Sequence, residues 1–156
     1  MHRVATRAMN HERVAAHLPV VRQVADDLVD AMTADGRRAD DLVAGYTDRL
    51  PLLTITRLLG IPADDCDRIR RWSGAYTHSH PGTPQALLPH RDGPKFVGFG
   101  GGRHYCPGRG LGRAILAVGL ERLRTRLPGL RLATDGPFPI AEREVGGVVT
   151  TLPVRW

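Results

Sequence analysis

The 156-residue chain has few cysteines, few aromatic side chains and no long apolar run. With only Cys66 and Cys106, it is not a disulfide-stapled miniprotein, and we expect both thiols to be reduced. No segment approaches the ~20 consecutive apolar residues that a membrane-spanning helix needs. The first residues contain no apolar core of signal-peptide length, so we expect a cytoplasmic protein that does not bind a membrane.

Lysine is nearly absent too, since 21 of the 22 basic residues are arginine, and the formal net charge is +6. A basic chain can bind nucleic acid. Here the arginines are scattered and alternate with aspartates on the expected helix faces, so we expect no nucleic-acid partner. The exception runs from Arg103 to Arg131, where seven arginines accompany one acid, Glu121. That segment favours an anionic ligand.

The rest of the composition is that of a folded protein, with 42% hydrophobic and 24% charged residues. The length suits one compact unit better than two full domains. Within it we distinguish an N-terminal helical segment, residues 1–75, and a segment rich in proline and glycine, residues 76–95. The third segment, residues 96–156, holds a glycine-rich loop, a helix and a small β region.

Apolar residues at helical spacing predict four helices. They cover residues 14–34, 47–59, about 64–75 and 107–127. Gly36 and Gly60 should end the first two helices, and Pro19 should mark a kink or a fresh start in the first. The second helix has leucine or isoleucine at so many positions (Leu52, Leu53, Ile55, Leu58, Leu59) that we expect it to be largely buried. Short β-type runs follow at 130–132 and 145–154, so the expected fold class is mainly α with a small C-terminal β region.

The segment Phe99–Gly108, FGGGRHYCPG, concentrates the residues that could perform chemistry. Three successive glycines let a backbone turn sharply and approach a flat ligand closely. Cys106 comes just before an expected helix N-terminus, which stabilises a thiolate. Arg103 and His104 add positive charge nearby. The pattern indicates a thiolate that binds a metal beside a planar group with anionic substituents.

The same ten residues resemble the haem-binding signature of the cytochrome P450 family, F-x-x-G-x-x-x-C-x-G. Phe99, Gly102, Cys106 and Gly108 occupy its fixed positions. The stretches RAMNHERVAAHLPVVRQVADDLVDAM and LPLLTITRLLGIPADDCDRIRRWSGA resemble helices of bacterial members. The final residues, 130–156, resemble the family's C-terminal β region. The resemblance covers nearly the whole chain except 76–95.

This resemblance implies a partial P450-like fold and a haem-thiolate monooxygenase that inserts one oxygen atom from O₂ into a small organic substrate. It implies that Cys106 is the axial thiolate ligand of the iron in haem b, with Phe99 near the sulfur. His104 and Arg103 would pair with a haem propionate, and the glycines would let the loop lie under the porphyrin; these are Gly100, Gly102 and Gly108. Electrons would come from a partner such as a ferredoxin with its reductase.

Two further P450 motifs have no counterpart at the expected place, and the chain is well under half of the usual family length. The oxygen-activating pattern [AG]-G-x-[DE]-T is approached only by Ala44–Asp48, AGYTD, which we interpret as coincidence because its order differs. The E-x-x-R spacing occurs at Glu121 and Arg124, after the cysteine, where it predicts an ordinary surface pair. No catalytic residue besides the haem ligand is identified.

These gaps keep other interpretations open. One is a haem-free or non-catalytic P450-like scaffold that binds another protein, and another is a non-functional remnant of an internal deletion. A zinc site built from His78, His80, His104 and Cys106 is a third, although its one-residue gaps are shorter than usual. Two copies of the chain could also associate to complete a pocket.

Overall fold

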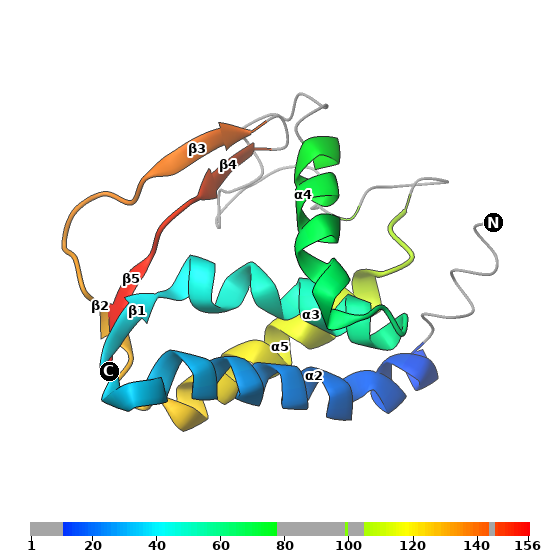
Figure 1. The fold of residues 1–156 in the computed structure, drawn as a ribbon, viewed down its shortest axis with the longest axis horizontal. Helices are drawn as coiled ribbons and strands as arrows, with labels where there is room; N and C mark the ends of the chain where they lie inside the picture. The colour runs from blue at the N-terminus through cyan, green and yellow to red at the C-terminus, as the bar shows by residue number, and fades with distance from the viewer. Residues whose placement is uncertain (1–10, 78–98, 100–104, 144–145) are drawn as a thin grey trace, which may run out of the picture.

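The computed structural model describes residues 11–77, 99, 105–143 and 146–156 (Figure 1). Their long helices are α2 (His11–Thr33), α3 (Arg49–Leu58), α4 (Cys66–Thr77) and α5 (Arg109–Arg126). Their strands are β1 (Ala39–Asp41), β2 (Arg131–Leu132), β3 (Ile140–Arg143), β4 (Gly146–Val149) and β5 (Pro153–Arg155). Short 3₁₀ turns and one π-helix, Val43–Thr47, connect them. The prediction of a mainly α fold with a small C-terminal β region is confirmed.

Helix α2 is continuous through Pro19. The helix begins at His11, so the fresh start considered for Pro19 is wrong. The Pro19 ring is exposed, and because proline has no backbone N–H, the helix lacks one of its backbone hydrogen bonds there. Gly36 follows with a φ of +72°, the left-handed conformation that the expected helix end requires.

The core lies where α2 packs against α5, with α3 alongside both (Figure 1). Helix α2 contributes an apolar stripe at helical spacing: Val21, Val24, Ala25, Leu28, Val29 and Met32. Helix α5 contributes the facing side chains: Leu111, Ile115, Val118 and Leu123. Burial of each large aliphatic side chain supplies about 1.5–3 kcal/mol, so this contact dominates the stability of the unit.

Helix α3 differs from its prediction. Its buried side chains are Leu50, Thr54 and Thr56, whereas Leu59, just after the helix, is 67% exposed. The leucine-rich face is only half-buried, because α3 turns Leu50 and Thr54 toward the core. A helix that is apolar on several faces does not reveal from its sequence which face a neighbour covers.

The strands form two small sheets. Antiparallel β5 lies between β1 and β2, and β3 pairs with β4 in a separate hairpin. The run predicted at 145–154 is therefore split between two sheets, and β1 was not predicted. The Asp41 carboxylate accepts hydrogen bonds from the backbone N–H groups of Val43 (3.0 Å) and Leu152 (2.9 Å). Asp41 thus joins the end of β1 to the segment before β5, which local sequence does not reveal.

Tyr46 connects the π-helix to α5 inside the core. Its side chain is 2% exposed, and its hydroxyl donates a hydrogen bond to the carbonyl oxygen of Gly119 at 2.9 Å. Burial raises the pKa of Tyr46 to about 12, with a smaller contribution from the carboxylate of Asp26. The phenol is therefore held neutral well above the pH at which an exposed tyrosine ionises.

Tyr46→Phe should destabilise the protein by about 1 kcal/mol at neutral pH, because one buried hydrogen bond is lost. The wild-type protein should also lose roughly 2–3 kcal/mol between pH 10 and 12, since the unfolded tyrosine ionises near 10 and the folded one near 12. The Tyr46→Phe curve should be flatter over that range. Urea unfolding at neutral and alkaline pH measures both effects, and parallel curves would contradict this role of Tyr46.

Candidate functional site

The described part of the predicted site is Phe99 together with Tyr105–Gly108, directly before α5. The backbone N–H of Cys106 donates to the carbonyl oxygen of Phe99 at 2.7 Å. This hydrogen bond joins the first and last residues of the segment Phe99–Cys106. The predicted site residues Gly100, Gly102, Arg103 and His104 lie outside the described residues.

Cys106 is a half-buried free thiol. Its carbonyl oxygen accepts a hydrogen bond from the N–H of Arg109 at 3.3 Å, and Gly108 caps the helix. Helix α5 therefore begins at Arg109 and not at Pro107, because Cys106–Arg109 forms a turn before the helix. The cysteine still lies next to the helix N-terminus, as the sequence predicted.

Phe99 lies against the first turn of α5. A Cβ placed on Gly112 would be 3.8 Å from Cε1 of the Phe99 ring, an ordinary van der Waals contact. The ring is half-buried. The structure thus brings Phe99 and Cys106 together on the N-terminal end of α5, as the spacing of the motif predicts.

Tyr105 and Arg109 form a pair beside the cysteine that the sequence analysis did not single out. The guanidinium of Arg109 lies over the Tyr105 ring, 5.5 Å from its centroid, and also donates to its hydroxyl. The four-residue spacing of tyrosine and arginine at a helix start was the available signal. The pair places a positive charge at the start of α5, beside the turn that contains Cys106.

Part of the basic charge between 103 and 131 is neutralised internally. Arg122 contacts Asp26 at 2.8 Å, and Arg126 contacts both Asp26 (3.3 Å) and Asp30, which joins α5 to α2. These arginines therefore stabilise the packing of the two helices, and the expectation of an anionic ligand applies only to the remaining basic residues of the segment.

The structure also describes the AGYTD string, the E-x-x-R spacing on α5 and the second cysteine. Tyr46, within the AGYTD string, is a buried core residue, which agrees with the interpretation of that string as coincidence. Glu121 and Arg124 are both exposed on α5, as expected of a surface pair. Cys66 begins α4, is 8% exposed and donates its S–H to Oγ1 of Thr56 at 3.4 Å.

The donor chemistry of the described site fits a metal held through one sulfur. Cys106 offers a soft thiolate donor, Phe99 is an apolar neighbour, and the closed loop brings the two together. Among the described residues, no cluster of three or more His, Cys, Asp or Glu side chains could hold a metal ion. His78, His80 and His104 of the zinc alternative lie outside that part of the chain, so that alternative stays untested.

Comparison with curated proteins finds partial matches. Mycinamicin IV hydroxylase/epoxidase of Micromonospora griseorubida is 42% identical over 76 residues, 49% of this chain and 19% of that protein. Pentalenic acid synthase of Streptomyces avermitilis is also 42% identical, over 47% of this chain and 18% of that protein. Nocardicin C N-oxygenase of Nocardia uniformis is 29% identical over 100% of this chain and 41% of its own length. The chain thus spans well under half of the length of these relatives. No protein-family model matches it.

Solved structures show the same fold. The chain matches a cytochrome P450-like monooxygenase of microbial secondary metabolism with a TM-score of 0.78 at 16% identity, over 99% of this chain and 80% of that chain. It matches P450BioI, solved with an acyl carrier protein that carries hexadec-9Z-enoic acid, with a TM-score of 0.79 at 12% identity, over 99% and 78% of the two chains. In the described part of the chain, no helix is both long and apolar enough to cross a bilayer.

Proposed function

Because this chain is a relative of the bacterial cytochromes P450 and is shorter than the proteins it matches, we propose that it is a haem-thiolate protein with monooxygenase activity. The observation that supports the proposal most strongly is the position of Cys106. Its half-buried thiol lies at the N-terminal end of α5, in a loop closed by the Cys106–Phe99 hydrogen bond.

In this proposal Cys106 binds the iron of haem b as an axial thiolate. When bound, a haem with thiolate ligation supplies the activation of O₂ and the insertion of one oxygen atom into an organic substrate. The Cys106 sulfur lies in the turn directly before α5. The Phe99 ring, which packs on Gly112, is proposed to lie near the sulfur, as the family resemblance implies.

The remaining loop residues have proposed roles that rest on the family resemblance. Gly100, Gly102 and Gly108 let the backbone approach the porphyrin. Arg103 and His104 pair with a haem propionate through charge-assisted hydrogen bonds. The Arg109–Tyr105 pair lies next to this loop and adds a further positive charge.

The partners of the reaction also belong to the proposal. The substrate is a small organic molecule, and the electrons come from a donor of the ferredoxin type. A net charge of +6 suits an acidic donor, because opposite charges accelerate association. A cytoplasmic location and self-association of two copies stay predictions.

The absorption spectrum of the purified full chain tests the proposal. Haem with thiolate ligation, once reduced and exposed to carbon monoxide, should show a Soret band far to the red. A colourless protein that does not bind added haemin would overturn the proposal in favour of a scaffold or a remnant. If the chain binds haem but forms no product with a competent redox partner, the monooxygenase activity would be refuted. The role of Cys106 as the haem ligand would stand.

A further inference from the structure

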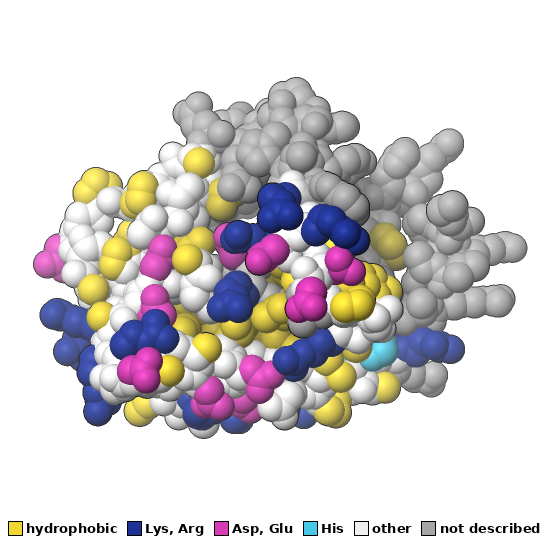
Figure 2. Space-filling view, viewed as in Figure 1, with side chains coloured by type: hydrophobic (Ala, Val, Ile, Leu, Met, Phe, Trp, Pro, Cys, Tyr) yellow, Lys and Arg dark blue, Asp and Glu magenta, His cyan; other side chains and the backbone are white. Residues whose placement is uncertain are grey.

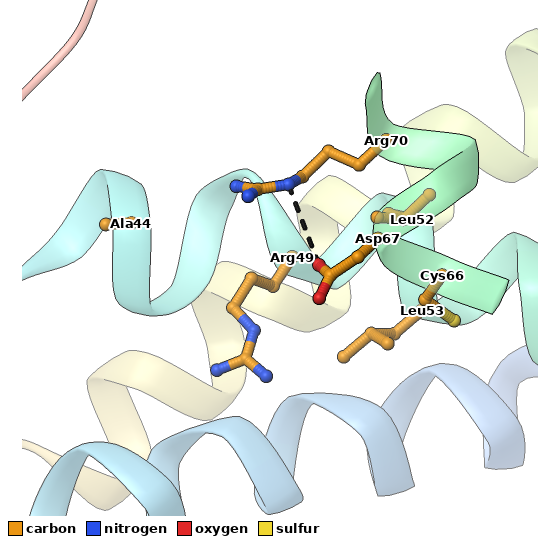
Figure 3. A pocket seen from close by; sticks show the side chains of 7 residues that line it. All are labelled: Ala44, Arg49, Leu52, Leu53, Cys66, Asp67 and Arg70. Carbon is orange, nitrogen blue, oxygen red and sulfur yellow. Dashed lines mark ion pairs between the residues drawn. The ribbon is translucent and has the colours of Figure 1, made fainter. Parts of the chain in front are cut away.

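A cavity of about 430 Å³ lies between α3 and α4 (Figure 3). Its main lining residues are Arg49, Leu52 and Leu53 from α3 and Cys66, Asp67 and Arg70 from α4. None of them belongs to the Phe99–Gly108 segment. A volume of this size accommodates a small organic molecule.

Two guanidinium groups and one carboxylate face the cavity. Figure 3 shows the Asp67 carboxylate between the side chains of Arg49 and Arg70. Asp67 and Arg70 form a long ion pair of 3.9 Å whose side chains are 80% and 61% exposed, so this pair contributes little to stability. The three groups together have a net charge of +1, which matches an anion with one negative charge. A doubly charged phosphate would be opposed by Asp67.

The other wall of the cavity is apolar. Leu52 and Leu53 are half-buried, and Leu53 also packs against the core. The Cys66 side chain also lines this wall, and its S–H donates a hydrogen bond to Oγ1 of Thr56. An aliphatic or aromatic body placed here would remove these side chains from water, which is favourable. Arginine side chains also gather with acidic ones on the surface over α3 and α4 (Figure 2).

We propose that this cavity binds an organic monocarboxylate, with the carboxylate on Arg49 and Arg70 and the apolar body on Leu52 and Leu53. Arginine binds a carboxylate through two parallel hydrogen bonds, which fixes the orientation of the ligand. This site is additional to the proposed haem function and does not depend on it.

Isothermal titration calorimetry of the full chain with sodium octanoate, kept below its micelle concentration, tests the proposal. Saturable binding is expected. Arg49→Gln should weaken it about tenfold, because a charge-assisted hydrogen bond to the carboxylate is lost. Asp67→Asn should strengthen it several-fold, because the competing negative charge is removed. Neutral 1-octanol should bind at least tenfold more weakly than octanoate.

Two control variants distinguish binding in this cavity from binding elsewhere on the chain. Arg22→Gln, on the exposed surface of α2, makes the same charge change away from the cavity and should leave octanoate affinity unchanged. Cys106→Ser should also leave it unchanged, whether or not haem is bound. Circular dichroism verifies that each variant is folded. Equal affinity in wild type and Arg49→Gln, or loss of binding in Cys106→Ser alone, would overturn the proposal.

Discussion

Cys106→Ser should abolish the thiolate-ligated haem spectrum. A serine hydroxyl is a hard, weakly acidic donor, so it cannot replace a thiolate on haem iron. The backbone hydrogen bond from residue 106 to Phe99 does not involve the side chain, so the loop should keep its shape. The expected result is complete loss of the red-shifted carbon monoxide band, with at most weak association of haem. Absorption spectroscopy and the haem content per chain measure it.

Cys66→Ser is the matched control, because Cys66 is the other cysteine in the sequence. Its sulfur donates to Thr56 within the α3–α4 contact, and a serine hydroxyl can make the same bond. This variant should retain the wild-type spectrum. If Cys106→Ser retained the thiolate spectrum while Cys66→Ser lost it, the ligand assignment would be wrong.

Gly119→Ala is expected to destabilise the folded chain, although alanine favours helices more than glycine by up to ~1 kcal/mol. A Cβ on Gly119 would be 2.5 Å from Cδ2 of Leu50, which is only 4% exposed. The Leu50 side chain would have to move within a packed core, at a cost of about 1–3 kcal/mol. The Tyr46 ring, 3.7 Å from the same position, limits the space for that movement. Urea or thermal unfolding gives the net change.

Gly112→Ala is the matched control on the same helix. Among the described residues, its Cβ would meet the Phe99 ring at 3.8 Å, so the helix preference of alanine should act without a clash. We expect Gly119→Ala to be about 1–3 kcal/mol less stable than Gly112→Ala. Combining Gly119→Ala with Leu50→Ala should cost less than the sum of the two single changes, since the clash is absent. Equal stability of the two alanine variants, with additive double-mutant energies, would refute the clash.

The sequence predicted the helices well, because they depend on short-range spacing. Apolar residues three and four apart located α2, α3 and α5 to within a few residues. The prediction that α5 begins at Pro107 was wrong, since the turn from Cys106 to Arg109 precedes the helix. The resemblance implied that Phe99 lies near the Cys106 sulfur; the structure shows a 2.7 Å backbone hydrogen bond between the two residues, and the contact of ring and sulfur stays a prediction. Most of the residues between them are not described, so their roles stay predictions.

The failures concern contacts between distant parts of the chain. Nothing in Ala39–Asp41 has strand character, and β1 forms because β5 lies beside it and Asp41 binds the N–H of Leu152. Helix α3 was expected to be largely buried, but Leu59 is 67% exposed, and Leu50, which the prediction did not single out, packs beside Gly119 of α5. Likewise, Arg122 and Arg126 looked available for a ligand until α2 placed Asp26 and Asp30 against them.

Composition and local spacing were therefore enough to establish a helical protein, its single cysteine loop and the family that it resembles. Helix periodicity and a ten-residue motif are properties of neighbouring residues, so both can be recognised without knowing the rest of the fold. Which leucines are buried, which arginines are paired and where the α3–α4 cavity lies depend on the packing of helices distant in sequence. Burial and ion pairing depend on contacts between residues that are far apart in the sequence, so only the folded structure reveals them.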